Sequence, residues 1–151
     1  AGVDVIDIGI VPTPLLYWSL HHVGVVGGIQ VTGSHNPPEY NGFKLSMGSG
    51  TLHGGDIQRL LALTGERHVA ATRGTVRGES VVERYVDDVL RRTGALARPI
   101  RAVWDCGNGA GAVVAPQAVG VLEELAGPGG GDLGVHSRVG EGTAFRLTLR
   151  R

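Results

Sequence analysis

One short stretch of the chain, Thr32–Lys44, combines a hydroxyl, a proton carrier and a positive charge. It reads T-G-S-H-N-P-P-E-Y-N-G-F-K. The hydroxyl of Ser34 is a potential nucleophile, and the imidazole of the adjacent His35 exchanges protons near neutral pH. Lys44 adds a compact cation at the end of the stretch. Groups of these three kinds are what phosphoryl transfer through a covalent phosphoserine requires.

The neighbours of Ser34 predict a stiff loop around it. Gly33 has no Cβ, which lets the backbone bend sharply and lets an anion come close. Pro37 and Pro38 fix φ and keep the residues before them out of helical conformations. The Asn41-Gly42 pair is typical of a tight turn and is expected to fold the chain back. The alternative interpretation is an ordinary solvated turn between two strands, which would also be rich in Gly, Pro and Asn.

The Thr32–Lys44 segment resembles the active-site loop of the α-D-phosphohexomutases, in particular their phosphomannomutase/phosphoglucomutase branch. The glucosamine branch usually reads A-S-H-N-P and then D-N-G-I-K. This chain instead has Thr32-Gly33 before the serine, and Tyr40 and Phe43 after it. These differences favour the hexose enzymes.

The resemblance implies a role for each residue of the loop. Phospho-Ser34 would give its phosphoryl group to a hexose 1- or 6-phosphate of mannose or glucose, and would recover the other one from the resulting hexose 1,6-bisphosphate. His35 would assist proton transfer or orient the phosphate, and Lys44 would stabilise charge or carry a proton. Which of these two is the general acid stays open. The residues expected to shape the loop are Thr32, Gly33 and Asn36.

The resemblance also implies Mg²⁺ as a cofactor. In the family the metal contacts the phosphate on the serine, and three aspartates of a D-G-D-x-D-R loop supply the other ligands. This sequence contains no such loop, so we expect it to contribute only Ser34, through its phosphate. Since Mg²⁺ neutralises charge on the transferring group, the activity of the chain alone stays open. The alternative is a non-catalytic α/β fragment that binds at most an anion or a partner.

The segments that must position this loop follow from the apolar pattern. A glycine-spaced apolar run, Val23–Thr32, predicts a buried strand that delivers Ser34 at its carboxyl end, where open α/β sheets place ligands. Phe43–Met47 predicts the next strand. The other elements expected on this side of the chain are a strand at Val3–Ile10 and helices at Leu15–His22 and Asp56–Leu63.

A polar stretch, Glu66–Glu79, is interpreted as a connector between this region and a further helix. Ser80 and Glu83 match the S-x-x-E capping box, so Ser80 is predicted to cap the helix, and Gly94 is predicted to end it. The buried stripe of this helix is expected to consist of Val81, Val82, Tyr85, Val86, Val89 and Leu90.

A second unit is expected to begin near Arg98, with a short strand at Ile100–Trp104, a glycine-rich loop and a helix at Ala112–Leu125. The V-W-D-C-G-N-G pattern around the strand end, followed by Ala115-Pro116, resembles the opening of the second domain of the same mutases. The tryptophan is a departure from the family pattern.

Gly107, Gly109 and Ala112 also satisfy the G-x-G-x-x-A dinucleotide fingerprint. No acidic residue follows on a clear second strand, and a tight turn into a helix explains the glycines equally well. The fingerprint therefore gives no nucleotide-binding prediction by itself.

The end of the chain departs from the mutase pattern. Gly127–Gly131 is interpreted as a flexible joint, and the G-E-G-T-A-F of Gly140–Phe145 is similar to the closing hairpin of histidine-kinase ATPase domains. Thr143, Phe145, Leu147 and Leu149 alternate as in a strand. An ordinary hairpin is the alternative, and without the partner motifs of those kinases the tail gives no prediction of ATP binding; a nucleotide-binding regulatory fragment is a hypothesis that rests on this tail alone. A fusion, a frameshift or a misjoined sequence is expected here.

The resemblance covers residues 1 to about 119 and predicts an α/β fold with a mixed sheet. We expect a partial phosphohexomutase domain I with the phosphoserine loop at 1–94. The first strand, loop and helix of domain II follow at 95–126, and an atypical Gly-rich joint and β-hairpin tail at 127–151. Because Ala1 already lies in a predicted strand, the chain is expected to be part of a longer protein.

Composition excludes several other classes of function. Lys plus Arg equal Asp plus Glu at 14 each, so no basic field indicates a nucleic-acid partner. The single cysteine, Cys106, excludes an internal disulfide framework and suits a reducing compartment. No long apolar run and no signal-peptide pattern is found, so a membrane partner is not expected. Composition thus predicts a cytoplasmic protein, and the resemblance implies an isomerase of carbohydrate metabolism.

Overall fold

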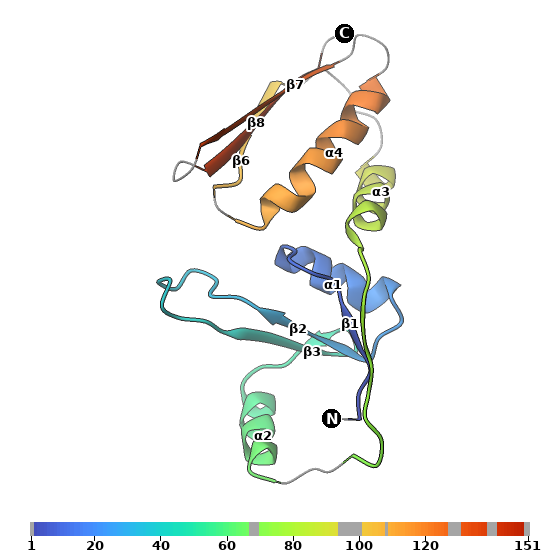
Figure 1. The fold of residues 1–151 in the computed structure, drawn as a ribbon, viewed down its shortest axis with the longest axis vertical. Helices are drawn as coiled ribbons and strands as arrows, with labels where there is room; N and C mark the ends of the chain where they lie inside the picture. Colours follow the sequence, from blue (N-terminus) through green and yellow to red (C-terminus); the bar gives the residue numbers. More distant parts are fainter. Residues whose placement is uncertain are drawn as a thin grey trace. The chain divides into compact units, whose positions relative to one another are not determined.

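The computed structural model describes residues 2–66, 70–93, 101–107, 109–126, 131–138 and 142–149. The expected α/β class with both parallel and antiparallel strands is confirmed (Figure 1). The chain divides into two compact units, one of Ala1–Asp7 with Thr13–Glu79 and one of Ile8–Pro12 with Ser80–Arg151. The domain boundary expected near residue 95 stays a prediction.

The first unit contains a three-stranded antiparallel sheet in the order β2-β3-β4. Its strands are β2 (Gly27–Val31), β3 (Phe43–Met47) and β4 (Gly50–Thr51). Ile29 lies opposite Leu45, and Val31 lies opposite Phe43. The bounds of β3 are those predicted, whereas β2 begins four residues after the predicted start at Val23.

Helix α1 (Thr13–His22) packs on one face of this sheet, and α2 (Gly55–Thr64) follows β4 on the other side in Figure 1. The close approach of α1 depends on Gly28, where an added Cβ would lie 2.7 Å from Leu16 Cδ1 and 3.1 Å from Leu20 Cδ2. The glycine spacing of β2 therefore makes room for the helix.

The prediction that β2 is a buried strand was wrong. Ile29 is 65% exposed and Val31 is 55% exposed. Successive side chains of a strand point to opposite faces, so these two residues point away from Gly28 and from α1. Phe43, opposite Val31, is 69% exposed on the same face. An apolar run alone does not show whether a strand is covered on one face or on two.

A second, parallel pairing joins β1 (Val5–Asp7) to β5 (Val76–Gly78), which lies inside the predicted connector. Its start is held by Asp4, whose Oδ1 accepts bonds from the backbone N–H and the Oγ1 hydroxyl of Thr75, both at 2.8 Å. These bonds stabilise the carboxylate, the backbone bond most strongly, and they lower the pKa of Asp4 below its usual value.

In the second unit, α3 (Val82–Thr93) begins later than predicted. The Tyr85 N–H donates to the Val81 carbonyl at 2.9 Å, so Val81 occupies the position before the helix and Ser80 does not cap it. Val81, Val82 and Val86 are buried as expected. Of the remaining stripe residues, Val89 is 39% exposed. The predicted end at Gly94 lies outside the described residues.

The rest of the second unit is a three-stranded antiparallel sheet with α4 (Gly111–Ala126) beside it (Figure 1). Its strands are β6 (Arg101–Asp105), β8 (Gly142–Leu149) and β7 (Gly131–Arg138), in that order. The predicted joint at 127–130 lies outside the described residues. No helix in the described part of the chain has the length and apolarity needed to cross a membrane.

The loop between β6 and α4 forms a local turn. Gly107 has φ +53°, and its N–H donates to Asp105 Oδ1 at 2.8 Å. The Gly109 N–H donates to the Cys106 carbonyl at 2.9 Å. Since β6 pairs only with the antiparallel β8 among the described strands, the parallel β-α-β unit of a dinucleotide site is not formed there. The turn into a helix accounts for the glycines.

Candidate active site

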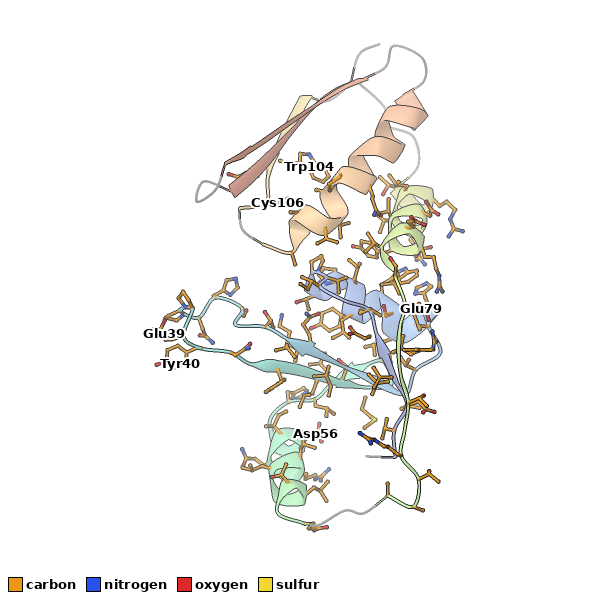
Figure 2. The ribbon with its side chains drawn as sticks, in the orientation of Figure 1. Glu39, Tyr40, Asp56, Glu79, Trp104 and Cys106 are labelled. Carbon is orange, nitrogen blue, oxygen red and sulfur yellow. The ribbon has the colours of Figure 1, made fainter. Side chains whose placement is uncertain are left out.

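The predicted phosphoserine loop connects β2 to β3. Its base is closed by the Thr32 N–H, which donates to the Gly42 carbonyl at 2.9 Å. Two successive turns reverse the chain within the loop: Asn36 N–H donates to the Gly33 carbonyl, and Tyr40 N–H to the Pro37 carbonyl, each at 3.0 Å. Figure 2 shows Tyr40 in this loop, away from α1.

Ser34 is the first central residue of the first turn. Its φ of 52° makes it the only non-glycine residue with a positive φ among the described residues. Turns with a positive φ at this position usually have glycine there. The Ser34 N–H donates to Thr32 Oγ1 at 3.0 Å. Strained backbone held by a local bond is typical of functional sites.

The hydroxyl of Ser34 lies beside the imidazole of His35. The Ser34 Oγ to His35 Nδ1 distance is 3.4 Å, which is at the long end of a hydrogen bond. With the proton on Nε2, Nδ1 can accept the hydroxyl proton of Ser34. Both side chains are exposed. The two residues are therefore placed for proton exchange at an accessible hydroxyl.

Lys44 occupies the second position of β3, opposite Gln30 of β2, and is partly buried. It lies on the face of the sheet that carries Gly28, since pairs two positions apart along the strands share a face. The structure thus brings Ser34 and His35 together and places Lys44 near the base of their loop.

Gly33 and Asn36 shape the loop through their backbones, whereas Thr32 also acts through its side-chain Oγ1. A Cβ added to Gly33 would lie 3.0 Å from the Tyr40 carbonyl oxygen, so the two sides of the loop approach closely at this glycine. Asn36 contributes the N–H that closes the first turn. Gly42 was missed as a site residue, although an added Cβ would lie 3.1 Å from the Thr32 carbonyl oxygen. The Asn41-Gly42 pair in the sequence was the signal that could have identified this glycine.

The prediction that Asn41-Gly42 folds the chain back was wrong. Asn41 Oδ1 accepts the Gly42 N–H at 2.9 Å, but this pair stands where the loop rejoins β3. The two turns that precede it perform the reversal. Asn41-Gly42 does not form a two-residue hairpin turn, because the paired strands already separate at Thr32, well before this pair in the sequence.

The described residues do not fit a complete magnesium site. They contain no group of three or more His, Cys, Asp and Glu side chains that could hold a metal ion. The side chain of Ser34 offers one oxygen, and the hydrogen-bond partner of that oxygen is the imidazole of His35. Only a phosphate on Ser34 would add oxygen ligands of the kind that Mg²⁺ prefers.

Residues 1–64, which include this loop, match the family described as "Phosphoglucomutase/phosphomannomutase, alpha/beta/alpha domain I". This part of the chain is therefore similar to domain I of the phosphoglucomutase/phosphomannomutase family. A phosphomannomutase/phosphoglucomutase of Pseudomonas putida is 39% identical over 122 residues, which are 81% of this chain and 26% of that protein. A phosphoglucomutase of Neisseria gonorrhoeae is 40% identical over 117 residues, or 76% of this chain and 25% of that protein.

The fold of the family is shared as well. A crystal structure of a phosphoglucomutase/phosphomannomutase family protein from Burkholderia thailandensis is similar, with a TM-score of 0.65 and 31% identity. The match covers 80% of this chain and 28% of that one. The chain thus spans about a quarter of the length of the family members it matches.

Proposed function

We propose that this chain is part of a phosphohexomutase that interconverts hexose 1-phosphate and hexose 6-phosphate, of mannose or glucose, through phosphorylated Ser34. The observation that carries the proposal is the hydroxyl of Ser34, held on a turn with positive φ and 3.4 Å from His35 Nδ1. The relatives' names, phosphomannomutase and phosphoglucomutase, support a sugar phosphate as the substrate.

The reaction consists of two phosphoryl transfers. In the first, the bond between Ser34 Oγ and phosphorus breaks while a bond forms between phosphorus and a hydroxyl oxygen of the hexose phosphate. The sugar hydroxyl proton passes to a base, for which His35 and Lys44 are the candidates, and a proton is returned to the Ser34 oxygen released from phosphorus. The resulting hexose 1,6-bisphosphate turns over, and its other phosphoryl group returns to Ser34 Oγ, whose hydroxyl proton passes to the base. The sugar oxygen freed by that step takes up this proton.

Mg²⁺ is proposed as the cofactor because phosphoryl transfer depends on neutralising the charge of the transferring group. Ser34 would take part in its binding through the phosphate. No step is assigned to the metal, because the described residues supply no further set of ligands. The cytoplasm is the proposed location, in keeping with the unpaired Cys106.

The direct test is phosphorylation of the chain by glucose 1,6-bisphosphate in the presence of Mg²⁺, followed by intact mass. We expect one added phosphate, which is lost in Ser34→Ala and retained in Ser49→Ala, an exposed serine of the same unit that serves as the control. Labelling that survives Ser34→Ala rejects the site, and no labelling of the unaltered chain rejects autonomous chemistry.

The second candidate is a non-catalytic unit that keeps the loop and binds a phosphate without transferring it. It is favoured by the lack of a metal-ligand group among the described residues. Under this alternative, glucose 6-phosphate shifts the NMR signals of Ser34 and His35, while the bisphosphate adds no mass to the chain.

A further inference from the structure

We propose that Thr32 is a positioning residue, whose hydroxyl oxygen holds Ser34 in the backbone conformation that presents the serine hydroxyl beside His35. The inference rests on the proposed phosphoserine chemistry and deepens it, because it names the group that sets the geometry of the nucleophile.

Thr32 joins the sheet to the serine by two different bonds. Its backbone N–H donates to the Gly42 carbonyl at 2.9 Å, directly after the last pair of the β2–β3 ladder. Its side-chain Oγ1 reaches two residues ahead and accepts the Ser34 N–H at 3.0 Å. The backbone bond fixes Thr32 to the strands, and the side-chain bond extends this order to Ser34.

Ser34 needs such support because its conformation is unfavourable. A positive φ brings Cβ of an L-residue too close to the neighbouring backbone, and Ser34 has φ 52°. The free energy of one hydrogen bond is of the same order as this penalty. Removing the Oγ1 acceptor therefore removes a contribution comparable to the strain that it offsets.

The rest of the loop does not depend on the threonine hydroxyl. The first turn is closed by the Asn36 N–H and the Gly33 carbonyl, and the base is closed by the backbone of Thr32 and Gly42. Valine has nearly the shape of threonine but offers no acceptor. Thr32→Val is thus expected to leave the loop closed and to free only the Ser34 amide.

Hydrogen exchange of single amides in the 151-residue chain, measured by NMR, tests the positioning role. In Thr32→Val the Ser34 amide should exchange roughly threefold to tenfold faster, as expected for the loss of one bond. Thr32→Ser keeps the oxygen and should restore the original rate. The amide of residue 32, bonded to Gly42, is the internal control and should not change. Unaltered exchange of Ser34 in Thr32→Val, or equally fast exchange in Thr32→Ser, overturns the proposal.

Phosphate loading from glucose 1,6-bisphosphate tests whether this geometry serves the reaction. Thr32→Val should load Ser34 more slowly than the unaltered chain, and Thr32→Ser should load it at the original rate. If Thr32→Val frees the amide but loads at the original rate, the threonine does not position the nucleophile and the proposal fails. If the unaltered chain takes up no phosphate, autonomous phosphoserine chemistry is rejected instead, and amide exchange alone decides the role of Thr32.

Discussion

Ser34 has a positive φ, so Ser34→Gly is expected to be more stable than Ser34→Ala. At most positions the alanine variant is the more stable of the two. Both substitutions remove the hydroxyl, and the difference between them isolates the effect of Cβ at φ 52°. The left-handed region costs an L-residue about 1–2 kcal/mol. Against this, glycine loses more conformational entropy on folding, which costs about 0.4–1 kcal/mol. Ser34→Gly should therefore be more stable than Ser34→Ala by about 0.5–1 kcal/mol.

Urea unfolding of the two variants measures this difference from their midpoints at a common slope. The control is Ala62→Gly on the exposed surface of α2, where φ is not positive. There glycine should lower the free energy of unfolding by about 1 kcal/mol. If Ser34→Gly is less stable than Ser34→Ala by an amount similar to this control, Ser34 does not hold a left-handed conformation in solution. The loop backbone is then not strained at Ser34.

The remaining predictions concern stability of the first unit. Because the bonds from Thr75 lower the pKa of Asp4, its carboxylate stabilises the fold fully above the unfolded pKa, and this contribution disappears as pH falls through the lowered folded pKa. In Asp4→Asn the urea midpoint of unfolding should therefore decrease less as the pH is lowered than it does in the unaltered chain. An identical dependence of the midpoint on pH in the two proteins would contradict this. Gly28→Ala should cost about 1–3 kcal/mol, because its Cβ would lie 2.7 Å from the buried Leu16 side chain. Gly55→Ala is the control, because a Cβ added at Gly55 would have no atom within 4 Å. An equal decrease in the urea midpoint of this variant would show that the cost at Gly28 does not come from packing against Leu16.

The loop and the strand after it were predictable because local sequence determines them. Phe43–Met47 was predicted with its observed bounds, and the turn residues around Ser34 do form a bent, closed loop. The fold class was predicted from the resemblance to the phosphohexomutases. The exact site of chain reversal was not predictable, since it depends on how far β2 and β3 stay paired, which neither strand specifies alone.

The other errors arose where distant residues decide the structure. Strand β5 was missed because it is short and polar, and its pairing with β1 is anchored by Asp4 and Thr75, which are 71 residues apart. The exposure of Ile29 depends on which face α1 covers, and an apolar run does not carry that information. The Tyr85 N–H donates to the carbonyl of the buried Val81, so α3 begins after Val81 and the capping pattern at Ser80 is not used.

Phosphorylation of Ser34 and turnover of the substrate are separate predictions for this chain. The hydrogen bonds described for the loop join residues within 32–42, so the shape that presents Ser34 needs little from the rest of the molecule. Stabilising the transferring phosphoryl group needs several charges around it at once, and the candidates for this near the loop, among the described residues, are His35 and Lys44. Under the proposed function we therefore expect the chain to accept one phosphate from a bisphosphate donor and to release it slowly. This arrangement favours rapid uptake of one phosphate per chain without sustained isomerisation of the sugar phosphate.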